Sequence, residues 1–264
     1  MQTKCRSHHH MIVITYPGCN QNVRETLKAL EANGLLKSFH TTMAFQDGDC
    51  LVKLAPASLR KQLLRRQFPC PRSKIITHPY REIIKQLAKR TPWRSLTSPE
   101  SFAAADTIGR DLDKEVAKYI EKHAGSIKAV FGYEDSCLLT FRTAKKHGIA
   151  RIYELTAPFW QTSRAIYNSG CQQHPEWSQT MGSLQSQELL ERKTEELKLA
   201  SLVLCISQFV YKSLPESVKA ETCCRVVNYG CPKIELIRNS EDSSARTDKK
   251  LRVLYVGALS QRKG

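Results

Sequence analysis

Residues 127–155 read IKAVFGYEDSCLLTFRTAKKHGIARIYEL, two β-rich runs separated by one helical stretch. The first run covers 127–133 and the second covers 151–155. The stretch between them carries Leu138, Leu139 and Phe141 and reaches a helix stop at Gly148. Because a strand, a helix and another strand in succession form a βαβ unit, these residues predict two parallel neighbouring strands.

The same alternation extends in both directions along the chain. Further strands are predicted at 11–15, 36–43, 202–206 and 225–229, and helices at 98–123, 187–200 and 207–214. An additional helix places Val23, Leu27 and Leu30 on one face and stops at 33–34. We therefore expect an α/β fold with a Rossmann-like, doubly wound, mainly parallel sheet. Ligands of such sheets bind beyond the carboxyl ends of the strands. The candidate site residues that follow strands are Gly18, Glu134, Asp135, Glu154 and Ser207.

Positive charge is the most unusual feature of the composition. The net charge is +16, and between Lys53 and Arg94 twelve Lys and Arg residues face one acid, Glu82. Such a segment attracts phosphates of lipids, nucleotides or nucleic acid. Within it, an apolar helical face is flanked by cations: Leu59, Leu63, Leu64 and Phe68 beside Arg60, Lys61, Arg65 and Arg66. Two interpretations stay open: this helix lies on an anionic membrane, or it docks on its own sheet with its charges in water.

The composition also bears on compartment and metals. A hydrophobic fraction of 41% is sufficient for a folded core, and no apolar run approaches the ~18 residues of a membrane span. Residues 1–10 are basic and lack the apolar region of a signal peptide. We expect a cytoplasmic protein, and peripheral contact of residues 53–94 with the inner membrane face belongs to the first of the two interpretations above. Cys223, Cys224 and Cys231 form no C-x-x-C pair, so we expect no metal.

Three segments, taken in order, resemble family 4 glycosyltransferases. Residues 191–210 (ERKTEELKLASLVLCISQFV) are similar to that family's helix–strand–helix E-R-K-x-E-E-L-x-L-A-D … S-x-F. Residues 226–232 (VVNYGCP) are similar to the V-I-P-Y-G-V strand that closes its N-terminal domain. Residues 254–264 (LYVGALSQRKG) are similar to F-V-G-x-L-S-x-R-K-G, which opens its C-terminal domain. The resemblance covers nearly the whole chain after Met11.

The resemblance implies a GT-B architecture, in which two Rossmann-like domains face each other across a cleft. The N-terminal domain of the family mainly binds the acceptor, and the C-terminal domain mainly binds the nucleotide-sugar. The implied reaction transfers a sugar with retention of anomeric configuration, usually without a metal, to a sugar, polysaccharide or lipid-linked acceptor. In this sequence an acceptor domain would cover 1–232, a surface linker 233–250 and the start of a truncated second domain 251–264.

The resemblance also suggests roles for particular residues. Gly18 would let the backbone of the first loop approach the diphosphate. Arg262 and Lys263 would bind that diphosphate at a helix start. A carboxylate on the acceptor side orients or deprotonates the attacking hydroxyl, and we expect Glu154 in this role, followed by Glu134 and Asp135.

Simpler structural roles remain open for these residues. The alternatives to a site role for Glu154 are a helix cap or an ion pair with a lysine, and Asp135 is a plausible N-cap. We expect Arg192 and Lys193 to form ion pairs with neighbouring glutamates on a solvated helix face.

The sequence departs from the family pattern in ways that keep two other functions open. Ala258 stands where many relatives have arginine, the first loop has one glycine where many have two, and the E-x7-E motif of the donor domain is absent. We therefore expect weak donor binding and slow or no turnover. One alternative is a non-catalytic acceptor-binding remnant. The other is a basic nucleic-acid-binding protein, although no helix-turn-helix, RNP or zinc-finger pattern supports specific nucleic-acid binding.

Overall fold

The computed structural model describes residues 11–89, 98, 101–102, 104–181, 185–230, 254 and 256–257. Within them, seven strands form one sheet in the order β3-β2-β1-β4-β5-β6-β7, and all six pairings are parallel. The strands are β1 (Ile12–Thr15), β2 (Leu36–Thr41), β3 (Ile75–Thr77), β4 (Ala129–Tyr133), β5 (Ala150–Leu155), β6 (Leu202–Cys205) and β7 (Cys223–Val226). The predicted Rossmann-like, doubly wound parallel sheet is confirmed.

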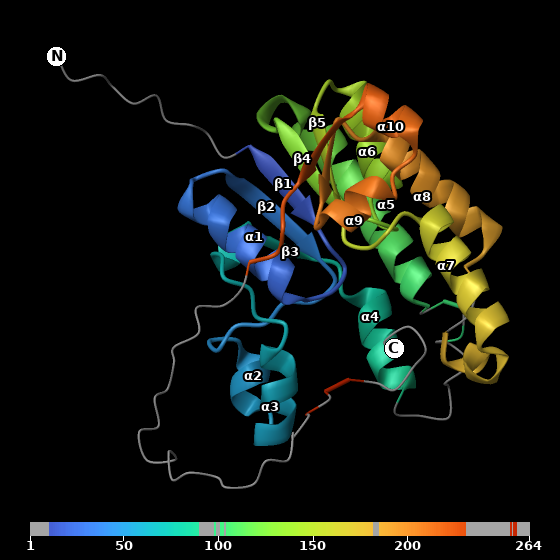
Figure 1. Ribbon diagram of the computed structural model, residues 1–264. Coiled ribbons are helices and arrows are strands. Elements are labelled where there is room, and N and C mark those ends of the chain that lie inside the picture. The colour runs from blue at the N-terminus through green and yellow to red at the C-terminus, as the bar shows by residue number, and fades with distance from the viewer. Residues whose placement is uncertain are drawn as a thin grey trace, which may run out of the picture.

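Helices cover the two faces of this sheet (Figure 1). The α-helices are α1 (Gln21–Ala32), α2 (Cys50–Leu54), α3 (Ala57–Leu64), α4 (Tyr80–Ala88), α5 (Ala105–His123), α6 (Leu138–Lys146), α7 (Trp160–Gln173), α8 (Gln187–Leu199), α9 (Gln208–Lys212) and α10 (Glu216–Glu221). Short 3₁₀ turns are η1 (Arg72–Lys74), η3 (Ala124–Ser126) and η4 (Pro175–Met181). The expected boundary at 232, the linker and most of 251–264 lie outside the described residues.

The two faces of the sheet belong to two apolar clusters, because successive strand residues point to opposite sides. Val13 and Val130 pack with α5, α6 and α8 in one cluster. Ile14 and Phe131, the next residues along, pack with α1 in the other. The strand order reverses between β1 and β4, so the crossover connections from this point place helices on both faces.

Helix α1 forms as its sequence predicts. The Asn20 side chain accepts a hydrogen bond from the backbone N–H of Val23 at 2.8 Å, which caps the amino end. Asn33 caps the other end, and Gly34 adopts a positive φ of 66°. Val23 and Leu27 are fully buried on the face that contacts the sheet.

Several predicted boundaries need correction. Helix α5 ends at His123 as predicted, but it begins at Ala105, and Ser98 is not its N-cap. Strand β7 begins two residues earlier than the predicted 225–229 and ends at Val226. Strand β3 and helix α4 were not predicted, because β3 has only three residues, too few to show a periodic pattern.

Gly132, in the middle of β4, is required by close packing. A Cβ atom at this position would lie 2.6 Å from the Cβ of Cys137 and 3.1 Å from the ring of Phe141. We expect Gly132→Ala to lower the free energy of unfolding by about 1–3 kcal/mol through overpacking. Gly125→Ala is the matched control, since no atom lies within 4 Å of its added Cβ. Equal urea midpoints for the two variants would contradict this account.

His40, on β2, is fully buried beside other titratable groups. Its Nδ1 lies 3.4 Å from Nε2 of His78, its Nε2 lies 3.2 Å from the Ser38 hydroxyl, and its ring packs against Tyr119. Burial, with the nearby His78 and His123, lowers the pKa of His40 from 6.5 to about 3. The folded state therefore keeps this imidazole neutral.

This depressed pKa predicts a loss of stability in mild acid. The unfolded chain takes up the His40 proton near pH 6.5 and the folded chain does not, so stability falls as pH drops below 6.5 towards 3. Between pH 7 and pH 5 the contribution is about 2 kcal/mol. Urea unfolding of the wild type and of His40→Gln at both pH values measures it. A variant that loses as much stability as the wild type would refute the assignment.

Candidate functional site

The carboxyl ends of β1, β4 and β5 bring predicted site residues to one edge of the sheet. These strands are neighbours, with β4 between β1 and β5. Gly18 follows β1, Glu134 and Asp135 follow β4, and Glu154 is the penultimate residue of β5. Tyr133 and Glu154 are partners in the β4–β5 register. The topology therefore gathers these residues along a common edge, as the strand pattern predicted.

Glu154 lies within a cluster of tyrosines on the α1 side of the sheet. Its Oε1 accepts a hydrogen bond from the Tyr229 hydroxyl at 3.0 Å. Tyr133 packs edge-to-face on Tyr16, with ring centroids 4.8 Å apart. The Tyr16 hydroxyl accepts a hydrogen bond from Nδ2 of Asn20 at 3.1 Å. Three other segments of the chain thus gather around this one carboxyl group.

The buried environment of Glu154 changes the pKa of its carboxyl group. Burial raises the pKa of Glu154, while the hydrogen bond from the Tyr229 hydroxyl opposes that rise. Burial, together with the negative charge of Glu154, raises the pKa of both tyrosines, so they remain hydrogen-bond donors at neutral pH. A carboxyl group with a raised pKa is suited to orient a hydroxyl or to accept its proton.

A cavity of 730 Å³ opens beside this carboxyl group, between α1 and the residues that follow β7. Its volume is within the range of small-ligand sites. The lining combines amides, hydroxyls, two carboxylates and one ammonium group with apolar surface: Gln21, Asn22, Glu25, Thr26, Lys28, Ala29, Leu30, Phe131, Glu154, Leu204, Cys205, Ile206, Val227, Asn228, Tyr229 and Gly230. Such a mixture of hydrogen-bonding and aromatic groups suits a ligand with many hydroxyls.

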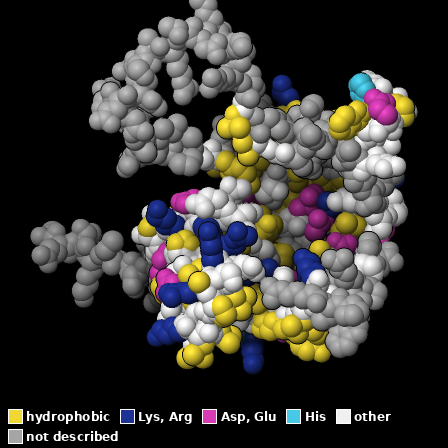
Figure 2. All heavy atoms as spheres, turned by 90° about the horizontal axis from the view of Figure 1, so that it is seen from below, with side chains coloured by type: hydrophobic (Ala, Val, Ile, Leu, Met, Phe, Trp, Pro, Cys, Tyr) yellow, Lys and Arg dark blue, Asp and Glu magenta, His cyan; other side chains and the backbone are white. Residues whose placement is uncertain are grey.

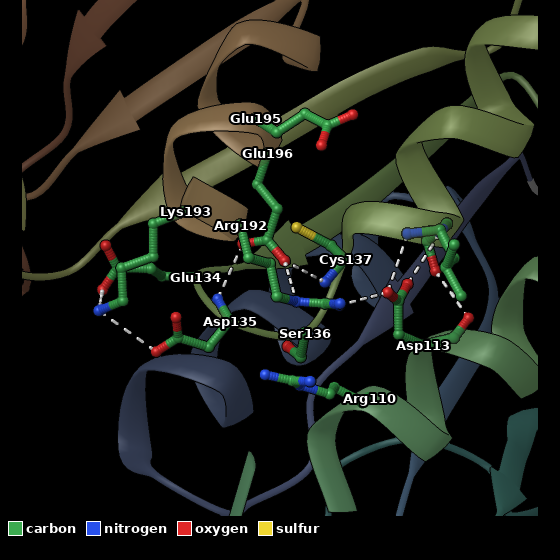
Figure 3. Close-up of polar contacts among 12 residues, drawn as sticks. Arg110, Asp113, Glu134, Asp135, Ser136, Cys137, Arg192, Lys193, Glu195 and Glu196 are labelled. Carbon is green, nitrogen blue, oxygen red and sulfur yellow. Dashed lines mark hydrogen bonds and ion pairs between the residues drawn. The ribbon is translucent and has the colours of Figure 1, made fainter. Parts of the chain in front are cut away.

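Glu134 and Asp135 belong to a different cluster, formed with α8 (Figure 3). Nζ of Lys193 lies 3.1 Å from the Glu134 carboxylate and 3.4 Å from that of Asp135. Burial raises the pKa of both carboxyl groups, and Lys193 opposes the rise. The three predicted acceptor-side carboxylates therefore do not converge, because Glu154 faces the tyrosines and the other two face Lys193.

The turn between β4 and α6 is fixed by buried ionic groups. The Glu196 carboxylate accepts backbone N–H bonds from Asp135 at 2.8 Å and from Cys137 at 3.1 Å. Arg192 pairs with Asp113 and, at 3.3 Å, with Glu196 (Figure 3). Burial raises the pKa of Glu196, and Arg192 with the two N–H donors opposes the shift. These contacts hold Asp135 in a left-handed conformation with φ of 73°.

Two expectations about this cluster were wrong. Asp135 is not the N-cap of α6, which begins at Leu138. Instead, the Asp113 carboxylate accepts the N–H bonds of Leu139 and Thr140, both at 2.8 Å, and so caps α6 from α5.

The second error concerns Arg192 and Lys193, which are not on a solvated face. Their side chains are 11% and 5% exposed. The signal for burial was present in the sequence, since Lys193 lies at i, i+4 from both Leu189 and Leu197 on the apolar side of the helix.

Gly18 lies against the Tyr16 ring, and its expected role at the diphosphate stays a prediction. A Cβ atom there would lie 3.1 Å from the Tyr16 ring. Its loop is held in place by the hydrogen bond from the Thr42 hydroxyl to the Pro17 carbonyl, at 2.6 Å. The expected phosphate ligands Arg262 and Lys263 lie outside the described residues.

Strand-end reasoning missed the roles of Tyr16, Tyr133 and Tyr229 around Glu154. All three have a signal in the sequence, because Tyr133 and Tyr229 end the predicted strands 127–133 and 225–229 and Tyr16 follows the predicted strand 11–15. In the described part of the chain, no group of three or more His, Cys, Asp or Glu side chains is placed to bind a metal. No helix there is both long and apolar enough to cross a membrane.

Comparisons with known proteins add a distant structural likeness. No protein-family model and no curated protein matches this sequence. Among solved structures, the chain is similar to a UDP-glucosyltransferase from Polygonum tinctorium capable of glucosylating indoxyl, in a complex with 3,4-dichloroaniline. The two chains are 15% identical with a TM-score of 0.40. The match covers 90% of this chain and 55% of the other, so this chain spans little more than half of that protein's length. A likeness at this level carries no argument about activity.

Proposed function

We propose that this chain is the acceptor-side domain of a nucleotide-sugar-dependent glycosyltransferase of GT-B architecture that acts with retention. One observation carries the proposal: a buried carboxyl group, Glu154, hydrogen-bonded by Tyr229 beside a 730 Å³ cavity at the carboxyl ends of the strands. The motif order in 191–210, 226–232 and 254–264 supports it. The acceptor is a sugar, polysaccharide or lipid-linked sugar, and its hydroxyl approaches Glu154.

The carboxylate of Glu154 acts on the acceptor hydroxyl in this proposal. The carboxylate accepts a hydrogen bond from the acceptor hydroxyl and so orients its O–H bond. Because the pKa of Glu154 is raised, the carboxylate is a stronger base than an ordinary glutamate and accepts the proton more readily. Tyr229 holds the carboxyl group in place through its 3.0 Å hydrogen bond. The amides of Asn22 and Asn228 line the same cavity, and an amide carries donors and an acceptor that suit ligand hydroxyls.

Glu134, Asp135 and Gly18 have supporting roles in the proposal. Lys193 pairs with both carboxylates and partly neutralises them. In the proposal, these ion pairs position the β4–α6 turn. The turn lies at the sheet edge where the second domain and the diphosphate would meet the acceptor. Gly18 leaves space for the loop backbone to approach that diphosphate. Arg262 and Lys263 would stabilise the departing diphosphate, as charge stabilisation of the leaving group requires.

The test is a transfer assay on the product of the complete reading frame that contains this sequence. UDP-glucose, UDP-N-acetylglucosamine and GDP-mannose are each incubated with a panel of methyl glycosides and lipid-linked sugars. We expect nucleoside diphosphate release that depends on one acceptor, with a product whose anomeric configuration matches that of the donor. Inertness with every donor and acceptor pair would contradict the proposal, and inversion would refute its stereochemical part.

A further inference from the structure

Helices α2 and α3 form a hairpin that extends beyond the carboxyl end of β2, at the lower end of the molecule in Figure 1. The hairpin is anchored at its base. The Phe45 N–H donates to the Arg66 carbonyl at 3.1 Å, and Phe68 packs edge-to-face on Phe39 in the core. Val52 is its buried residue, and no side chain of α3 is fully buried. Of the predicted apolar face, Leu59, Leu63 and Leu64 are half-buried and Phe68 is buried, while Arg60, Lys61 and Arg65 are exposed. That face therefore fits the interpretation in which the helix docks on its own domain with its charges in water.

The hairpin exposes large apolar side chains. Leu51 is 71% exposed and Leu54 is 85% exposed, although both belong to the same short helix. Single exposed leucines are common on protein surfaces and carry no meaning by themselves. Two leucines one turn apart, on a hairpin that also concentrates positive charge, form an amphipathic surface.

Cations surround a hollow between α3 and α1, where Arg24 of α1 donates to the carbonyls of Arg65 and Gln67. The hollow has a volume of 510 Å³ and is lined by Arg24, Ala57, Arg60, Lys61, Leu64 and Arg65. Among the described residues, Lys53, Lys61 and Arg65 form no ion pair, and Arg60 has only a distant, exposed partner, Asp47 at 3.8 Å. Figure 2, which views this side directly, shows Lys and Arg side chains gathered beside hydrophobic ones.

Arg66 does not belong to this surface. Its guanidinium donates to the buried Glu82 carboxylate at 2.6 Å and to the Thr42 hydroxyl at 3.1 Å. It therefore anchors the hairpin to the body of the domain, and its charge is used internally. The sequence grouped it with Arg60, Lys61 and Arg65, and the structure separates it from them.

We propose that the α2–α3 surface docks on an anionic lipid bilayer. Leu51 and Leu54 enter the boundary between headgroups and acyl chains. The positively charged side chains around the hollow bind the negatively charged phosphates of the lipid headgroups. Nucleic acid would satisfy the cations but would leave both leucines in water, so a bilayer is the partner that uses both features. The proposal is independent of the sugar-transfer function.

Vesicle flotation tests this proposal. Vesicles of phosphatidylcholine alone are compared with vesicles that contain phosphatidylglycerol as a minority lipid, in about 0.1 M salt, where charges still attract within a Debye length. We expect the wild-type chain to float at least about tenfold more with the anionic vesicles. The variants Lys53→Glu/Lys61→Glu and Leu51→Ser/Leu54→Ser should each lower this binding about tenfold or more.

Matched controls separate the surface from general charge and apolarity. Lys122→Glu/Lys128→Glu changes the net charge equally, with two exposed lysines near the amino end of β4. Phe209→Ser removes an apolar side chain that is 56% exposed on α9. Both controls should float like the wild type. Circular dichroism on all variants verifies that the substitutions, which are at exposed positions, leave the fold intact.

Three outcomes would overturn the proposal. The first is equal flotation of the wild type with neutral and anionic vesicles. The second is a charge control that loses as much binding as Lys53→Glu/Lys61→Glu. The third is a 30-base-pair DNA duplex that binds more tightly than the vesicles, with no effect of the leucine substitutions, since this would identify a nucleic-acid surface.

Discussion

Replacing Arg192 with alanine is expected to lower the free energy of unfolding by about 3–5 kcal/mol, because it leaves buried carboxylates without their cation. The Arg192 side chain is 11% exposed, and those of its partners Asp113 and Glu196 are fully buried. Both partners also fix backbone N–H groups, at the start of α6 and in the turn that follows β4. The loss therefore spreads from one side chain to a helix cap and to a candidate site loop.

Arg142→Ala is the matched control for Arg192→Ala. Arg142 also pairs with a glutamate, Glu195, but the two side chains are 51% and 43% exposed. An exposed pair contributes only about 0–1 kcal/mol. Urea unfolding followed by circular dichroism gives both values. If Arg192→Ala costs no more than Arg142→Ala, the buried network does not stabilise the turn.

The second large effect concerns Glu154 and sugar binding. We expect Glu154→Gln to weaken the affinity for a methyl glycoside ligand about tenfold or more, because hydrogen bonds to a charged group contribute about 1.5–3 kcal/mol. Saturation-transfer NMR and isothermal titration measure this affinity. Glu176→Gln, on an exposed side chain outside the cavity, should leave it unchanged.

The pH dependence distinguishes a binding role for Glu154 from a structural one. The pKa of Glu154 is raised by burial, so its carboxylate form is lost as pH falls through a value above the ordinary range of glutamate. As pH falls through the pKa of Glu154, the affinity of the wild type for the sugar should fall. The affinity of Glu154→Gln should stay constant over the same pH interval. A wild-type affinity that is constant over this interval would contradict a role for the ionised carboxyl group.

The sheet could be read from the sequence because its strands are short apolar runs separated by clear helix starts and stops. Ile12–Thr15 and Ala150–Leu155 are examples, and α1 was predicted together with its carboxyl-terminal stop at 33–34, although its N-cap, Asn20, was not. Strand β3 was missed because three residues show no period. Helix α5 begins later than predicted because its N-cap is Ala104, not the serine six residues before it that local preference favours.

The candidate site was only partly predictable, for a physical reason. Strand ends lie at the same edge of a parallel sheet, so the positions of Gly18, Glu134 and Glu154 followed from the topology. Which carboxylate pairs with which cation depends on contacts between distant segments. Glu134 meets Lys193 and Glu154 meets Tyr229, at sequence separations of 59 and 75 residues. No local pattern encodes those pairings.

The most direct test of the central claim is to locate sugar binding on the chain by amide NMR. A ¹⁵N-labelled sample is titrated with the methyl glycoside that shows the strongest saturation transfer. We predict that the shifted amides gather around the cavity beside Glu154, in residues 21–30, 131, 154, 204–206 and 227–230. Shifts that gather elsewhere, for example around the hollow lined by His78 and Glu115, or no shifts with any glycoside, would contradict the account.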